Sequence, residues 1–206
     1  MYRFILGFVV AIGLSTGFFG LSTSPGNAEI APLKEATAEM VVGDPAAKVT
    51  LIEYASLGCP HCANFHKDTY PKIKKDYIDT GKLKLIYRDF PLGTPALAAS
   101  MISRCAGPAR YFGMVEIFYR GQVQWSKADK PIDALKSVAR FGGMSGSDVD
   151  ACLQSQDLLN FIQKMAREGQ KEYGINSTPS FVLGGKTIPG ALPFEDFKKL
   201  IDAELK

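Results

Sequence analysis

The feature that most constrains this chain is a pair of cysteines two residues apart, where an apolar strand runs into a helix. Residues 48–54 are mostly apolar and β-branched, as in a strand buried on both faces, and Cys59-Pro60-His61-Cys62 follows a short turn. At a helix N-terminus, free backbone N–H groups and the helix dipole stabilise an anion, so we expect Cys59 to ionise more readily than an ordinary thiol. We interpret Cys59 as an exposed nucleophile and Cys62, one turn deeper, as its partner in a reversible disulfide.

Two other interpretations of this pair stay open. Together with His66 the cysteines could begin a zinc site, but a tetrahedral site needs a fourth ligand, and His61 and His66 are the only histidines. The pair could also be an inert structural disulfide, although so short a spacing closes almost no loop and restrains the unfolded chain little. The strand-to-helix context favours redox chemistry, and we expect neither a metal nor another cofactor.

The two residues between the cysteines have separate predicted roles. His61 lies in the first helical turn and can donate a hydrogen bond toward the Cys59 sulfur. Pro60 removes a competing backbone N–H. The alternative for His61 is a solvated side chain with no role in the chemistry.

The N-terminus predicts export. Arg3 gives a short positive segment, residues 4–19 are almost wholly apolar, and small residues around Ala28 suit cleavage there, so residues 1–28 are predicted to be a signal peptide. An uncleaved membrane anchor is the alternative, because the apolar run is long. The formal net charge is +3, and no basic run interleaves with aromatic residues, which argues against a nucleic-acid partner.

Export also bears on the other two cysteines, Cys105 and Cys152. Disulfides persist outside the cytosol. Because two of the four cysteines remain after Cys59 and Cys62 are paired, these two are expected to form a second disulfide. Neither residue has a partner two residues away, so we interpret the bond as structural, worth about 2–4 kcal/mol. Two free buried thiols are the alternative.

The order of predicted elements divides the mature chain into three parts. Residues 29–38 predict a flexible lead-in, and a helix over 63–80 is expected to kink at Pro71. The final helix, 194–205, should turn Phe194, Phe197, Leu200, Ile201 and Leu205 inward. The predicted parts are a first α/β part, an inserted helical domain and a second α/β part, over residues 39–93, 94–174 and 175–206. Helices in the insert are predicted over residues 96–106, 109–120, 132–141, 148–154 and 156–173.

This order, β then β-α-β, a helical block, and β-β-α, resembles a thioredoxin-like α/β fold with an inserted helical domain. Together with the Pro-His dipeptide of Cys59-Pro60-His61-Cys62, it resembles the DsbA family of periplasmic thiol oxidases over essentially all of residues 41–205. The resemblance implies a periplasmic, monomeric thiol:disulfide oxidoreductase that introduces disulfides into exported proteins with free cysteines. It also implies reoxidation by a membrane quinone-coupled protein.

Three further residues are assigned by this resemblance. Pro179 matches a cis-proline that faces the cysteine pair, so that Thr178 would offer its backbone N–H and C=O to an extended peptide. Glu53, six residues before Cys59, matches a buried acid that could shuttle the proton of Cys62. On its own terms, Glu53 could instead face solvent at a sheet edge, and Pro179 could be an ordinary trans proline. Thr178 departs from the valine of the best-known members, so a disulfide isomerase or reductase of the same fold is the alternative.

Overall fold

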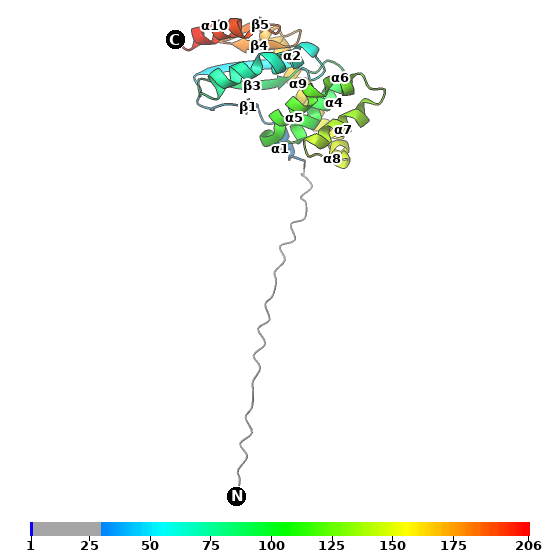
Figure 1. Ribbon diagram of the computed structural model, residues 1–206. Helices are drawn as coiled ribbons and strands as arrows, with labels where there is room; N and C mark the ends of the chain where they lie inside the picture. The colour runs from blue at the N-terminus through cyan, green and yellow to red at the C-terminus, as the bar shows by residue number, and fades with distance from the viewer. Residues whose placement is uncertain (2–29) are drawn as a thin grey trace.

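A five-stranded mixed sheet forms the centre of the molecule, in the order β1-β3-β2-β4-β5 (Figure 1). The computed structural model describes Met1 and residues 30–206, so the predicted signal peptide, Met1 apart, lies outside the described residues. β2 pairs with β3 in parallel, and every other pair in this sheet is antiparallel. The strands are β1 Met40–Val42, β2 Val49–Ala55, β3 Leu83–Asp89, β4 Ser180–Leu183 and β5 Lys186–Pro189.

The central position of β2 follows from its sequence. Both neighbours of β2 are strands, so its backbone groups are paired on each edge. Its side chains are buried or half-buried on both faces, as the apolar sequence predicts. Leu51, Glu53 and Ala55 share one face because side chains alternate along a strand, and Ile52 and Tyr54 share the other. β2 ends at Ala55, and the turn that leads to the cysteine pair leaves the sheet from this carboxyl end of the strand.

Helices cover the sheet and fill the long connection between β3 and β4. Figure 1 shows α4 to α8 gathered beside the sheet, away from α10. This connection confirms a thioredoxin-like fold with a helical insertion, while the division into domains at residues 94 and 174 stays a prediction. The helices are α1 Leu33–Ala36, α2 Pro60–Asp68, α3 Tyr70–Ile73, π-helix η1 Lys74–Ile78, α4 Thr94–Cys105, α5 Pro108–Arg120, α6 Gln122–Ser126, α7 Pro131–Phe141, α8 Gly146–Leu153, α9 Gln156–Tyr173 and α10 Phe194–Glu204.

Three local expectations differ from the structure. The lead-in is not simply flexible, because it forms α1 and buries Ala36. The helix expected over 63–80 already begins at Pro60 and breaks at Thr69, two residues before Pro71, which has no N–H to continue the hydrogen-bond ladder. Leu200 in α10 is 37% exposed rather than inward-facing.

Each face of the sheet packs against different helices. On one face, the rings of Phe65 in α2, Phe181 in β4 and Phe197 in α10 lie with centroids 4.7–5.5 Å apart. On the other, α9 approaches β2 so closely that a Cβ on Gly169 would lie 2.3 Å from the Tyr54 ring, so this position accepts only glycine. Among the described helices, none combines the length and apolar character needed to cross a membrane.

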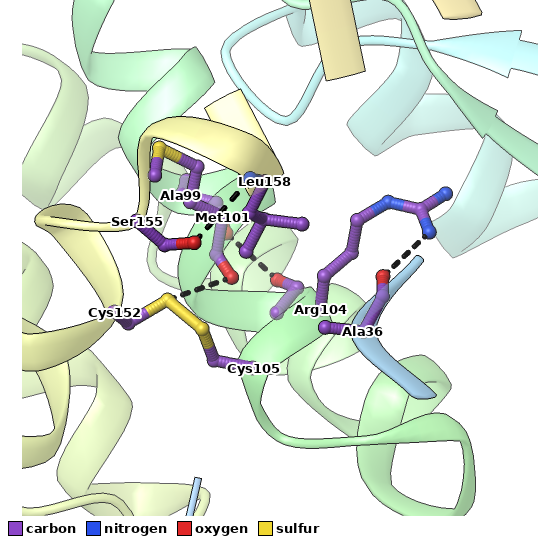
Figure 2. Close-up of a disulfide and its surroundings, with 9 residues drawn as sticks. Ala36, Ala99, Met101, Arg104, Cys105, Cys152, Ser155 and Leu158 are labelled. Carbon is purple, nitrogen blue, oxygen red and sulfur yellow. Dashed lines mark hydrogen bonds between the residues drawn. A yellow bond between two sulfur atoms is a disulfide. The ribbon is translucent and has the colours of Figure 1, made fainter. Parts of the chain in front are cut away.

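A buried arginine joins the helical part to the sheet and to the N-terminal segment. Arg104 in α4 is fully buried and donates from Nε to Asp89 at the end of β3, at 2.5 Å. Its Nη1 donates to the carbonyl oxygens of Ala36 and Ala38, at 3.0 and 3.1 Å, and Figure 2 shows the first of these bonds. Asp89 also accepts from the hydroxyl of Tyr111 in α5. One side chain therefore ties three separate stretches of the chain together.

A disulfide lies beside this arginine. Cys105, at the end of α4, is bonded to Cys152 in α8 with an S–S distance of 2.02 Å (Figure 2). Both residues are buried, and the Cys152 sulfur lies 3.1 Å from the carbonyl oxygen of Met101. The bond therefore links two helices of the insert, away from the cysteine pair at the end of β2.

Candidate redox site

The turn after β2 places Cys59 at the N-terminus of α2. Cys59 is the N-cap residue, with an extended backbone, and Pro60 takes the first helical position, where its missing N–H costs no hydrogen bond. The Cys59 backbone N–H donates to the carbonyl of Ser56 at 3.0 Å, which closes the turn. Cys59 and Cys62 are both free thiols. Cys59 is buried rather than exposed as expected, because Thr178 lies against its sulfur; it keeps 7% of its surface accessible, and Cys62 keeps none. The cysteine at the helix end is thus the one that a partner can reach.

The surroundings of Cys59 favour its thiolate. A hydrogen bond from the Cys62 thiol, helped by the backbone N–H groups of Cys62 and His61, lowers the pKa of Cys59 to about 5 despite its partial burial. Thr178 beside the sulfur lowers the pKa of Cys59 further, although its buried hydroxyl makes no hydrogen bond of normal geometry within residues 30–206. Cys59 is therefore ionised at neutral pH.

Cys62 has the opposite character. Burial raises the pKa of the Cys62 thiol far above that of Cys59, and the nearby charges of Cys59 and Glu53 raise it further. The reduced pair therefore holds one thiolate, on Cys59, and one proton, on Cys62. This asymmetry assigns the two sulfurs different chemical roles.

The loop before β4 completes the rim around Cys59. The Thr178–Pro179 peptide bond is cis, and Pro179 is buried. The carbonyl oxygen of Thr178 lies 3.2 Å from the Cys59 sulfur. Because β4 pairs with β2, with Ser180 opposite Tyr54, the sheet fixes this loop beside the cysteine turn.

Glu53 lies beneath the pair and is not at a sheet edge. It is wholly buried, and both of its carboxylate oxygens contact Nε2 of His66, at 3.0 and 3.1 Å. The zinc interpretation would require His66 to face the cysteines, but His66 Nε2 faces Glu53 instead. Among the described residues, no three His, Cys, Asp or Glu side chains come together as metal ligands.

The side chain of His61 does not donate the expected hydrogen bond to the Cys59 sulfur. Its side chain is exposed, and among the described residues its imidazole has no hydrogen-bond partner, while its backbone N–H stabilises the Cys59 thiolate. Pro60 is exposed beside it. Of the dipeptide, His61 therefore acts on the sulfur, and it does so through its backbone N–H.

Gln122 is a site residue that sequence reasoning missed. Its buried amide nitrogen donates to the carbonyl oxygens of Leu57 and Cys59, at 2.6 and 3.0 Å, so the short helix α6 holds the cysteine turn from the side of the insert. Nothing in the local sequence marks this glutamine, because its partners are more than sixty residues away. His66 lies four residues after Cys62 on the same face of a helix, but this spacing alone does not indicate that its ring contacts Glu53.

Comparisons with known proteins agree with this geometry. The family model described as Thioredoxin matches residues 35–203. The chain is 30% identical over 148 residues to the "Putative protein-disulfide oxidoreductase" of Rickettsia bellii (strain RML369-C), which covers 71% of this chain but only 57% of that relative. It is 24% identical over 192 residues to "Disulfide bond formation protein D" of Bacillus subtilis (strain 168), covering 89% of this chain and 85% of that one.

Solved structures give the same result. Alpha-DsbA1 of Wolbachia pipientis is 29% identical with a TM-score of 0.75, covering 81% of this chain and 90% of that one. Oxidised BdbD of Bacillus subtilis is 23% identical with a TM-score of 0.73, covering 86% and 96%, which shows a shared fold. The extent of the family match, and the helical insertion shared with these neighbours, lead to one assignment. The chain belongs to the thioredoxin family, as a DsbA-like member with a helical insertion.

Proposed function

We propose that this chain is a thiol:disulfide oxidoreductase that introduces disulfides into exported proteins through Cys59 and Cys62. The observation that carries the proposal is the asymmetry of the pair. Cys59 is reachable with a pKa of about 5, while Cys62 is buried with its pKa raised. A stabilised thiolate favours the reduced form, which makes the disulfide form a strong oxidant of other thiols.

The proposed reaction begins with the Cys59–Cys62 disulfide. A client thiolate attacks the Cys59 sulfur, Cys62 leaves as a thiolate and takes up a proton, and a mixed disulfide joins the client to Cys59. A second client thiolate then attacks the client's sulfur in that bond, and Cys59 leaves as a thiolate. The client loses two electrons and gains a disulfide, and the protein is left with two reduced cysteines. The low pKa of Cys59 makes it a good leaving group in the second step.

Recognition in this scheme depends on the backbone of the cis-proline loop. Thr178 lies beside the Cys59 sulfur, and an extended client segment would pair with its backbone N–H and C=O, which tolerates many client sequences. Residues 1–28 would direct the protein to the periplasm, where it acts as a monomer. A membrane quinone-coupled protein would then accept the two electrons and restore the disulfide.

The proposal is tested with the oxidised protein and a reduced peptide that carries two cysteines. We expect wild type to form the peptide disulfide stoichiometrically without oxygen. Cys59→Ser should abolish this reaction, and Cys62→Ser should accumulate a mixed disulfide between Cys59 and the peptide. Preferential alkylation of Cys62 in the reduced wild type would contradict the assignment of the nucleophile. A reduction potential in the range of reducing thioredoxins would instead support a reductase or isomerase.

A further inference from the structure

The partner of the buried acid is a histidine. Glu53 is wholly buried in the middle of the sheet, and both of its oxygens contact His66 Nε2, at 3.0 and 3.1 Å. A buried carboxylate is costly unless hydrogen bonds satisfy it, and a bond from an N–H donor favours the ionised form. Tyr87, opposite Glu53 in β3, carries no positive charge. A carboxylate can only accept, so the Nε2–H of His66 donates this hydrogen bond.

Aromatic rings fix the orientation of His66. Its ring stacks on Tyr119 in α5, with centroids 4.7 Å apart and planes at 30°. Tyr70 lies 4.9 Å away, and Phe65 and Tyr87 meet the imidazole edge-to-face. The side chain is 8% exposed. Because the ring is packed on these sides, Nε2 stays directed at Glu53.

Few of the groups around His66 change charge near neutral pH. Burial raises the pKa of Tyr70, Tyr87 and Tyr119, so these phenols stay neutral, and the last two share a hydrogen bond of 2.8 Å. Asp79 and Glu116 act on Tyr70 from the outer side and lie at the surface. On its own helix His66 shares a face with Cys62, whose pKa is raised. The remaining titratable partner is Glu53.

We propose that His66 is a positioning residue, whose Nε2–H fixes the orientation of the buried Glu53 carboxylate beneath the cysteine pair, so that this carboxylate can exchange a proton with Cys62. This inference rests on the function proposed above. During reoxidation the Cys62 thiol gives its proton to Glu53, and the resulting thiolate attacks the Cys59 sulfur in the mixed disulfide and expels the partner thiolate. When Cys62 leaves during client oxidation, the proton returns from Glu53.

The step that depends on Cys62 can be isolated with glutathione disulfide. The reduced protein reacts through Cys59 to a mixed disulfide, and Cys62 then expels glutathione, so the second rate reports proton loss from Cys62. His66→Phe keeps the aromatic stacking but removes the donor, and His66→Gln keeps an N–H at a similar reach. We expect His66→Phe to slow this rate about tenfold at neutral pH and move its pH profile up by about one unit, because a hydrogen bond to a charged group is lost. His66→Gln should restore most of the rate.

A double variant separates positioning from a general loss of structure. In a Glu53→Gln background, His66→Phe should have almost no further effect on the rate, because the carboxylate that it positions is gone. Equal rates for wild type and His66→Phe would overturn the inference. So would equally slow His66→Phe and His66→Gln, since the imidazole itself would then be required.

Failure of the inference and failure of the proposed function give different results. Glutathione release reports Cys62 whether or not the protein oxidises clients. A wild type that fails to oxidise the reduced peptide, yet shows the His66-dependent rate, would remove the proposed function and leave the role of His66 in place.

Discussion

Replacing Cys62 with alanine should raise the pKa of Cys59. The Cys62 thiol makes the largest contribution to the low pKa of Cys59, which is about 5. A hydrogen bond to a charged group is worth about 1.5–3 kcal/mol. Since one pKa unit corresponds to roughly 1.36 kcal/mol, its loss should raise the pKa of Cys59 by about 1–2 units. The backbone N–H groups at the start of α2 remain, so the pKa should stay below the ordinary thiol value of 9.0.

The assay is the ultraviolet absorbance of the thiolate in reduced protein as the pH is varied. Cys105 and Cys152 are bonded to each other and do not contribute, so Cys62→Ala leaves Cys59 as the single titrating thiol. Cys62→Ser is the matched control, because its hydroxyl can still donate and should shift the midpoint less. In Cys59→Ser the absorbance should stay flat through neutral pH, since the pKa of Cys62 is raised.

Two results would refute this reasoning. A midpoint still near 5 in Cys62→Ala would mean that the helix backbone alone holds the thiolate. Equal shifts for Cys62→Ala and Cys62→Ser would mean that the hydrogen bond is not the cause.

The direction of the Cys59 pKa shift also determines how the stability of the reduced protein depends on pH. Because the pKa of Cys59 is lowered on folding, the thiolate stabilises the reduced protein fully above pH 9.0, and this stabilisation is lost as the pH falls to about 5.

Three other changes test separate parts of the structure. Glu53→Gln should slow glutathione release by Cys62 and keep the Cys59 thiolate. Its thermal unfolding midpoint should stay the same or rise, because an amide is less costly to bury than a carboxylate. If both the rate and the stability were unchanged, the proton-shuttle role would be dropped. Gln122→Leu removes the side-chain donor to the Leu57 carbonyl, while the Cys59 carbonyl keeps the Ala63 backbone N–H, and it should lower the free energy of unfolding by about 1–3 kcal/mol, measured in denaturant. Replacing Cys105 and Cys152 with alanine should lower it by about 2–4 kcal/mol and leave the titration of Cys59 unchanged.

Local sequence was enough to predict much of this fold. The strand predicted over residues 48–54 and the five helices predicted in the insert agree with β2, α4, α5, α7, α8 and α9 to within two residues at each end. The cysteine turn could be placed because strand, turn and helix are contiguous in the chain. Sequence patterns therefore predict well those elements whose structure depends on residues close to them in the chain.

The parts that local sequence could not predict depend on distant contacts. The helix α6 is only five residues long, and Gln122 acts on Leu57 and Cys59 across the fold. The partner of Glu53 is set by how α2 packs on β2, not by spacing in the sequence. Leu200 fits the apolar stripe of α10 but lies at its margin, where the sheet no longer covers it. Tertiary packing decides each of these cases.

The shared arginine limits how this protein could be shortened. Cutting α4 to α9 out of the chain and joining β3 directly to β4 would remove Arg104, leaving Asp89 and the carbonyl oxygens of Ala36 and Ala38 without that partner. Removing one member of a buried ion pair is strongly destabilising wherever the remaining charge is kept from water, so Asp89 would have to be solvated or replaced. A minimal, thioredoxin-sized version would first need Asp89 replaced by an apolar residue and the N-terminal segment redesigned.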